Sequence, residues 1–182
     1  MGARVEAFDT RPDVEEQVKS LGAKFVKIDL GEMGQTEQGY AKELTPEQIE
    51  IQRKAQAKVC ASSDVVITTA KVFGRKAPLL LTKDMVSQMK PGSIIIDMAV
   101  KTGGNVEGSN PDKDVVLENG VTIIGGDSLE RNIPKDASDM FSGNMFAFFE
   151  HFWDAEKKAF TVDKSDEIMG SCLITLDGEV LR

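Results

Sequence analysis

The stretch RVEAFDTRPD, residues 4–13, ends a short apolar run on an acid, Asp9, which is followed closely by Arg11 and Pro12. A carboxylate at the end of a strand can accept hydrogen bonds from the hydroxyls of a ribose. In dinucleotide-binding folds this acid comes about twenty residues after a Gly-x-Gly-x-x-Gly turn, but only eight residues precede Asp9. An acid between a strand and a helix also serves as a helix cap, and both interpretations stay open here.

Two further groups of residues lie at the carboxyl ends of predicted strands, Thr68–Lys71 and DMAVKTGGN, residues 97–105. Ligands of open parallel sheets bind beyond the carboxyl ends of the strands, where loop amides and helix N-termini gather. Gly103 and Gly104 would allow a backbone to approach a ligand closely, although a plain tight turn explains them equally well. The two threonines can also be simple strand formers.

Other catalytic chemistry finds little support in the sequence. The one histidine, His151, lies among aromatic residues, and we expect it to be packed or at the surface. Cys60 and Cys172 are far apart without a Cys-x-x-Cys pattern, so we expect two buried, reduced thiols. We assign no catalytic acid, base or nucleophile, and no metal ligand.

Composition disfavours two classes of partner. The 182 residues include 22 Lys and Arg against 30 Asp and Glu, a net charge of -8. Such a surface repels nucleic-acid backbones and anionic lipids. The longest apolar runs are far shorter than the roughly 20 residues that cross a bilayer, so we do not expect this chain itself to insert into a membrane.

The hydrophobic pattern alternates between strands and helices, which indicates an α/β fold with a largely parallel sheet. Continuous β-branched runs predict strands covered by helices on both faces. The apolar stripe in the last long helix, which includes Met140, Phe141, Met145 and Phe149, is expected to be core. The predicted strands are 5–8, 24–28, 64–70, 93–99 and 121–125. The predicted helices are 12–21, 45–61, 83–90 and 137–153, and Thr45 with Gln48 three residues later predicts a capping box at the start of the second. A hairpin should turn on Asp177–Gly178.

Taken in order, these segments are distinctive. GARVEAFDTRPDVEEQVKSLGAKFV, GYAKE, DVVITTA, GRKAPLLLTKDMVSQMKPGSIIIDMAVKTGGN and GVTIIG resemble the NAD(H)-binding component, domain I of the alpha subunit, of proton-translocating NAD(P) transhydrogenase. The resemblance runs from Gly2 to the final DGEV. It implies an incomplete Rossmann-like domain over residues 1–160 and a C-terminal extension with a hairpin over residues 161–182.

The resemblance also explains the early position of Asp9. The family places a glycine-rich first βα unit, and another lobe before it, ahead of the matching segment. The sixteen glycines form no Gly-x-Gly-x-x-Gly, so we expect this sequence to begin midway through a nucleotide-binding fold. The absent strand is central in that fold, and its loss should leave two strand edges that pair with each other or with another chain.

For the cofactor, NAD(H), the resemblance implies specific positions. Asp9, with Arg11 beside it, would bind the adenosine ribose and favour NAD over NADP. Gly39 and Tyr40 would lie in a mobile loop that closes over the nucleotide. Thr69, Ala70 and Lys71 would border the dinucleotide, and Asn105 would lie near the nicotinamide.

The activity that the resemblance implies is hydride transfer from NADH to NADP, coupled to proton translocation. The expected partners are the NADP-binding and membrane components, with a homodimer or a swapped oligomer of this chain. The expected location is the cytoplasmic face of a bacterial inner membrane or the mitochondrial matrix side. Two alternatives remain: a non-catalytic nucleotide-binding module or fragment, and an alanine dehydrogenase-like oxidoreductase. Lys101 stands where alanine dehydrogenases carry an acid, which argues against the second. Transhydrogenase relatives commonly carry Glu at that position, so Lys101 departs from both patterns.

Overall fold

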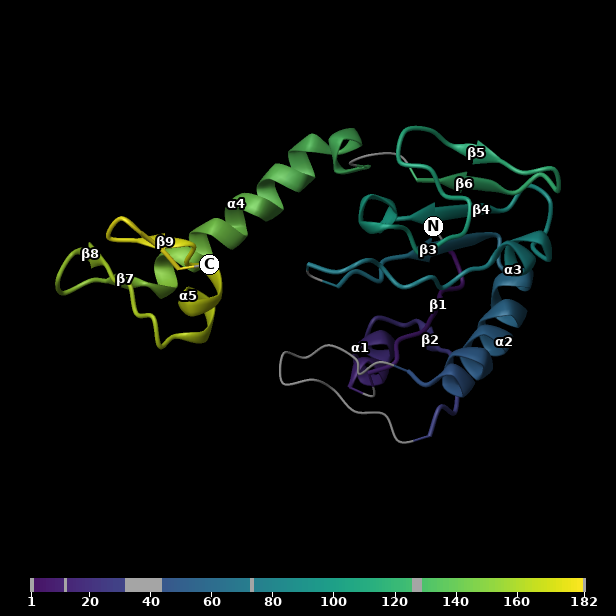
Figure 1. Ribbon diagram of the computed structural model, residues 1–182, viewed down its shortest axis with the longest axis horizontal. Helices are drawn as coiled ribbons and strands as arrows, with labels where there is room; N and C mark the ends of the chain where they lie inside the picture. Colours follow the sequence, from purple (N-terminus) through teal and green to yellow (C-terminus); the bar gives the residue numbers. More distant parts are fainter. Residues whose placement is uncertain (1, 12, 32–43, 73, 126–128, 182) are drawn as a thin grey trace. The chain divides into compact units, whose positions relative to one another are not determined.

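The computed structural model describes the chain except for residues 1, 12, 32–43, 73, 126–128 and 182. Two compact units are present, Met1–Asp127 and Ser128–Arg182 (Figure 1). The boundary proposed from the sequence near residue 160 stays a prediction.

The first unit contains a four-stranded sheet in the order β3-β4-β6-β5. Strands β3 (Val65–Thr68), β4 (Ile94–Asp97) and β6 (Thr122–Ile124) are parallel, and β5 (Val115–Val116) is antiparallel to β6. Strands β1 (Glu6–Ala7) and β2 (Lys24–Phe25) form a separate parallel pair. The α/β class and the largely parallel pairing are therefore confirmed.

One face of the four-stranded sheet builds the core. Register aligns Val66 with Ile95, Ile95 with Ile123, and Ile123 with Val115, so one row of side chains crosses the sheet. This row packs with residues from α2 (Pro46–Ser62), α3 (Lys83–Ser87) and the adjoining loops. Fully buried Ile95 and Ile123 lie at its centre. Burial of these apolar side chains holds the helices on this face.

The opposite face of the same sheet differs. Val65 and Ile67 alternate with Val66 along β3 and are 53% and 61% exposed. On β5, Val116 is 71% exposed. The sequence predicted helices on both faces, whereas α2 and α3 cover only the face that carries Val66. Continuous β-branched runs reveal that a strand suits burial, but not which element buries it.

Helix starts follow local signals. Thr45 caps α2: its hydroxyl accepts the Gln48 backbone N–H, and the Gln48 side chain accepts the Thr45 N–H. This reciprocal capping box was predicted and is confirmed. The Gln48 side chain also donates to the Leu30 carbonyl at 2.7 Å, which ties α2 to the segment after β2. Helix α1 (Val14–Ser20) is shorter than predicted and lies beside β2.

The second unit contains α4 (Pro134–His151), the hairpin of β7 (Trp153–Asp154) with β8 (Ala159–Phe160), α5 (Glu167–Cys172), and the hairpin of β9 (Thr175–Leu176) with β10 (Glu179–Val180). The last hairpin turns on Asp177 and Gly178, with φ of 52° and 86°. Positive φ at both positions matches the tight turn that was predicted.

The predicted core role of the α4 stripe is wrong for the described residues. Met140 is 74% exposed, Phe141 66% and Met145 51%. At the C-terminal end of α4, Phe149 stacks on Trp153 with ring centroids 5.3 Å apart, yet it remains 47% exposed. Periodicity showed that α4 has an apolar side but not whether another element packs on it.

The two cysteines are free, as expected, but only Cys60 is buried. Burial raises the pKa of the Cys60 thiol, which keeps it protonated and unreactive. Cys172 is exposed at the end of α5, so its predicted burial is wrong. It lies in a short helix of the second unit, where few neighbours cover it.

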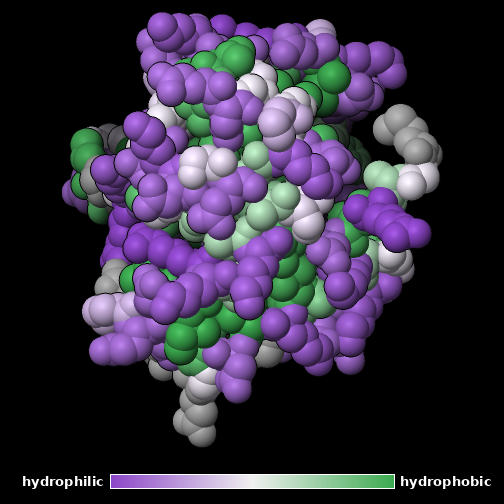
Figure 2. Space-filling model, turned by 90° about the vertical axis from the view of Figure 1, so that its right-hand side faces the viewer, coloured by the Kyte–Doolittle hydropathy of each residue, from purple (hydrophilic) through white to green (hydrophobic). Residues whose placement is uncertain are grey.

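The surface agrees with the acidic composition. Seen from the side on which α2 and α3 lie in Figure 1, hydrophilic residues cover most of the face, with hydrophobic patches between them (Figure 2). Among the described helices, none combines the length and apolar character that a membrane crossing requires.

We expect the open side of β3 to drive self-association. Among the described residues, β3 pairs only with β4, and an apolar edge of this kind templates strand pairing. Replacing exposed Ile67 with Lys should change the free energy of unfolding by less than about 0.5 kcal/mol and shift the chain toward monomer in sedimentation velocity. The control is Ile51→Lys, at an exposed position on α2; equal effects of both substitutions would contradict this role for β3.

Candidate functional site

Asp9 lies two residues beyond β1 and is held by Arg11. Its Oδ1 accepts the Arg11 backbone N–H at 2.8 Å and the Arg11 Nε–H at 3.0 Å, while its Oδ2 accepts Nη2–H at 2.9 Å. The Asp9 side chain is 28% exposed and that of Arg11 42%. The sequence alternatives were a ribose acceptor and a helix cap. Asp9 caps no helix: Asp13 occupies the N-cap position of α1.

The Asp9–Arg11 pair lines a cavity of about 360 Å³ between the ends of β1 and β2. Cavities that hold small molecules typically measure about 300–1,000 Å³. Beyond the two predicted residues, its wall includes Glu15, Lys27 and Asp29, which sequence reasoning missed. Their place follows from the register of the two strands, because parallel pairing of Ala7 with Phe25 places residues 27–29 beside residue 9. Lys27 Nζ lies 2.8 Å from Glu15 Oε1, so this wall carries paired charges.

The pKa of Asp9 lies below its ordinary value of 3.8. Partial burial acts to raise this pKa, but the hydrogen bonds from the Arg11 side chain and backbone, with the attraction of its charge, outweigh that effect. Asp9 is therefore ionised at neutral pH and acts as a hydrogen-bond acceptor.

The second group of predicted residues meets at the carboxyl ends of β3 and β4. Ala70 and Asn105 are brought together: the Ala70 N–H donates to Asn105 Oδ1 at 3.0 Å, and Asn105 Nδ2 donates to the Ala70 carbonyl at 2.9 Å. Thr69 and Lys71 on either side of Ala70 are exposed. The Thr69–Lys71 corner thus presents polar groups outward while its backbone is fixed from behind.

Asp97, the last residue of β4, organises the loop that follows. Its carboxylate accepts the backbone N–H groups of Ala99 at 2.9 Å, Asn105 at 3.0 Å and Val106 at 3.2 Å. Only 1% of Asp97 is exposed. A buried carboxylate is stable when such donors replace the lost water. The loop therefore closes around Asp97, over the 3-10 turn η1 (Val100–Thr102).

Gly103 and Gly104 serve this closed loop. A Cβ at Gly104 would lie 3.0 Å from Asp97 Oδ2, and a Cβ at Gly103 would lie 2.6 Å from Lys76 Cγ. Both glycines also have positive φ, 107° and 78°. Of the two sequence interpretations, the structure supports the tight turn, packed on side chains of the chain itself.

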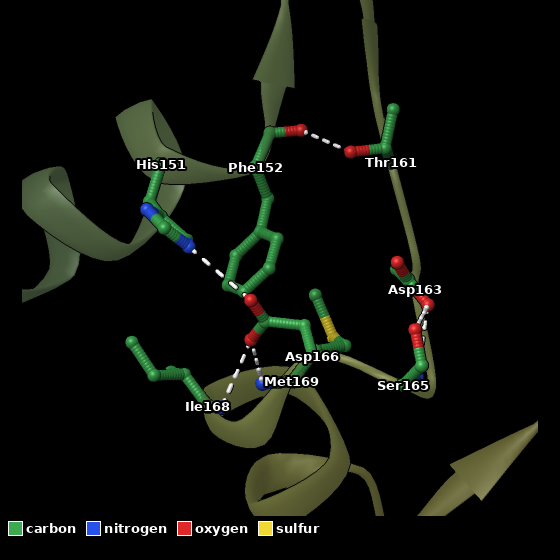
Figure 3. A network of polar contacts seen from close by, with 8 residues as sticks. All are labelled: His151, Phe152, Thr161, Asp163, Ser165, Asp166, Ile168 and Met169. Atoms are coloured by element: carbon green, nitrogen blue, oxygen red, sulfur yellow. Dashed lines mark hydrogen bonds and ion pairs between the residues drawn. The ribbon is translucent and has the colours of Figure 1, made fainter.

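His151 lies in the second unit and takes part in a capping network (Figure 3). Its Nε2 is 3.4 Å from Asp166 Oδ2, while Asp166 Oδ1 accepts the N–H groups of Ile168 and Met169 at the start of α5. Hydrogen bonding from Met169, followed by the weaker contribution of His151, lowers the pKa of Asp166 despite some desolvation. The arrangement joins the end of α4 to α5 and agrees with the expected surface position of His151.

Two predicted positions, Gly39 and Tyr40, lie outside the described residues. Lys101 is exposed within η1. Across the part of the chain that the structure describes, His, Cys, Asp and Glu form no group suited to a metal ion.

Comparisons with known proteins add the family. The model for "Alanine dehydrogenase/PNT, C-terminal domain" matches residues 1–182. The chain belongs to this family. It is 42% identical over 182 residues to an NAD(P) transhydrogenase subunit alpha chain of Rickettsia prowazekii, covering 100% of this chain and 46% of the relative. It thus spans less than half the length of that protein.

A solved structure shows the same relationship. The crystal structure of the transhydrogenase from Sinorhizobium meliloti aligns with this chain at a TM-score of 0.74 and 36% sequence identity. The alignment covers 99% of this chain and 46% of the transhydrogenase chain. The chain is also 49% identical to the alanine dehydrogenase of Bacillus subtilis, but only over 51 residues, which are 28% of this chain and 14% of the relative. The resemblance to the transhydrogenase alpha subunit is therefore confirmed along the whole sequence.

The steric effect of a side chain at residue 104 can be measured separately from the cost of its positive φ. Gly104→Ala and Gly108→Ala both place a side chain at positive φ, 78° and 88°, but only the Cβ at residue 104 meets Asp97. The backbone term should cost each variant about 1–2 kcal/mol. We expect Gly104→Ala to lose at least about 1 kcal/mol more, because the buried carboxylate must shift from its donors. Urea unfolding measures both, and equal losses would contradict the close packing.

The Asp9–Arg11 pair predicts a pH-dependent stability. With Arg11→Gln, the pKa of Asp9 should rise, because the charge of Arg11 no longer offsets the effect of burial. Since the native pKa is depressed, Asp9 stabilises the fold above its unfolded pKa, and this contribution is lost as pH falls through the native pKa. The stability deficit of Arg11→Gln should therefore shrink in acid. Carbon-13 NMR titration of the Asp9 carboxyl tests the expected rise in its pKa, with Lys19→Gln as the control. An Asp9 titration curve that is the same in Arg11→Gln as in wild type would contradict the prediction.

Proposed function

We propose that the chain is the NAD(H)-binding part of a transhydrogenase alpha subunit. In this proposal Asp9 accepts hydrogen bonds from the adenosine ribose within the cavity at the carboxyl ends of β1 and β2. The observation that carries the proposal is the ionised Asp9 carboxylate, held by Arg11 at the carboxyl end of a parallel strand. Such an acid at this position in an α/β sheet suits a ribose diol.

The geometry leaves room for a ribose at Asp9. A carboxylate has about four acceptor sites, and Arg11 occupies three of them. The partly exposed side chain of Arg11 can turn aside, which frees an acceptor site on Asp9 for the second hydroxyl of the ribose. Asp9 would repel a 2′-phosphate, which favours NAD over NADP, whereas Arg11 beside it attracts phosphate. Selectivity between NAD and NADP therefore depends on whether repulsion of the 2′-phosphate by Asp9 outweighs its attraction by Arg11.

The Thr69–Lys71 corner would border the rest of the dinucleotide. Thr69 and Lys71 are exposed at the carboxyl end of β3, where helix termini and loop amides favour anionic ligands. A lysine there offers a positive charge to phosphate groups. Gly39 and Tyr40 are proposed to cover the nucleotide from the loop that contains them.

The complete reaction would need more than this chain. We propose that hydride passes from NADH held here to NADP held by a separate component, and that a membrane component couples the transfer to proton passage. Nicotinamide supplies the redox chemistry, so this chain has to bind and orient the cofactor. The proposed location is the cytoplasmic face of a bacterial inner membrane or the mitochondrial matrix side.

A non-catalytic nucleotide-binding module is the second candidate. Alanine oxidation has less support, since the sequence similarity to the alanine dehydrogenase is short.

Titration with NADH, followed by its fluorescence, tests the proposal. The wild-type chain should bind saturably, and Asp9→Asn should weaken binding by at least about tenfold, because a charged acceptor is lost. The preference for NADH over NADPH should also narrow. The control is Asp64→Asn, an equal change of charge just before β3, in the other sheet of the first unit.

Three outcomes separate the candidates. Binding that Asp9→Asn and Asp64→Asn weaken equally would contradict the ribose site. Hydride transfer to an NADP analogue after addition of an NADP-binding component would favour the transhydrogenase over the non-catalytic module. Turnover of alanine would instead favour an alanine dehydrogenase-like activity.

A further inference from the structure

Asn105 has its hydrogen-bonding groups directed into the protein. Its Nδ2 donates to the carbonyls of Ala70 at 2.9 Å and Pro78 at 2.8 Å, and its Oδ1 accepts the Ala70 N–H. Its backbone carbonyl accepts the N–H groups of Leu80 and Leu81 at 2.8 and 3.0 Å. Asn105 is 0% exposed. It therefore fixes the segment from residue 70 to residue 81 at both ends.

The position of Asn105 is itself fixed from β4. Asp97 Oδ2 accepts the backbone N–H of Asn105 at 3.0 Å and of Val106 at 3.2 Å. A continuous series of hydrogen bonds thus runs from the end of β4, through Asn105, to the corner that follows β3. A side-chain amide has two N–H donors, and both are used within the protein, so none is left for a ligand.

We propose that Asn105 is a positioning residue for dinucleotide binding, which sets the place of the Thr69–Lys71 corner without touching the ligand. This inference rests on the proposed function and changes the role expected for Asn105, which was a place beside the nicotinamide. Because Ala70 is bonded to Asn105 through both its N–H and its carbonyl, loss of the amide frees the corner. A ligand must then order that corner on binding, which lowers affinity.

The chain offers a matched control in Asn119. Its Nδ2 donates to the carbonyls of Val86 at 3.1 Å and Ser87 at 3.3 Å, and its Oδ1 accepts the Val121 N–H at 3.2 Å. These are the same kinds of side-chain bond to backbone groups that Asn105 makes, although Asn119 is only partly buried. Asn119 precedes β6, however, and so lies at the amino end of the parallel strands. Its removal should affect stability without affecting the proposed ligand edge.

The test compares Asn105→Ser with Asn119→Ser in the full chain. Each variant is titrated with NADH, and its stability is measured by urea unfolding. Asn105→Ser should weaken binding about tenfold, since small displacements of a binding group cost this much or more. Asn119→Ser should keep affinity within about twofold although it also loses stability, because the bonds that it loses lie away from the proposed ligand edge.

The outcomes distinguish this inference from the proposed function. If wild type binds NADH and both variants weaken binding in proportion to their loss of stability, Asn105 is merely structural and the inference is overturned, while the proposed function stands. If wild type shows no saturable binding, the proposed function fails and the inference fails with it.

A second measurement needs no variant. In wild type labelled with nitrogen-15 at asparagine and alanine, NADH should shift the backbone amide resonance of Ala70. It should give no nuclear Overhauser contact between the ligand and the Asn105 side chain. Such a contact would identify Asn105 as a ligand-binding residue and overturn the positioning role.

Discussion

The candidate ligand edge of the sheet depends on one buried carboxylate. Asp97 is enclosed at the end of β4 and draws three backbone N–H groups toward it, which forces the following loop to fold back. That closure places Asn105 where its amide reaches the corner after β3. Gly104 is needed because the carboxylate occupies the space a side chain would fill. Once Asp97 is fixed, the geometry of two strand ends follows.

The second candidate group, Asp9 with Arg11, depends on a shorter-range interaction. Asp9 and Arg11 are only two residues apart, and their bonds form within one turn of chain beyond β1. The two groups therefore differ physically. Asp97 and Asn105 are buried and position backbone, whereas Asp9 and Arg11 are partly exposed and can exchange partners with a ligand. A dinucleotide needs both kinds of residue, rigid supports and accessible acceptors.

Features that local chemistry determines could be predicted from the sequence. The capping box of Thr45 and Gln48 and the turn at Asp177–Gly178 each involve a few neighbouring residues, and both are observed. The parallel class followed from the alternation of strands and helices. The family resemblance also came from sequence, because ordered motifs carry more information than any one of them.

Features that depend on packing could not be predicted in the same way. The apolar side of α4 looks like core in sequence, yet it stays exposed because the described residues provide little to cover it. The roles of Lys27 and Asp29 in the cavity wall required the register of β1 with β2. The inward orientation of Asn105 required the loop that Asp97 closes. Sequence pointed to the candidate ligand edge, but it could not distinguish residues that support this edge from residues that would contact a ligand.

A crystal structure of the chain with bound NADH tests the central claim most directly. The account predicts that the adenosine ribose lies within hydrogen-bonding distance of the Asp9 carboxylate, while the Asn105 amide keeps its bonds to Ala70 and Pro78. A nucleotide bound elsewhere, with Asp9 still closed on Arg11, or an Asn105 amide turned to the nicotinamide, would contradict it.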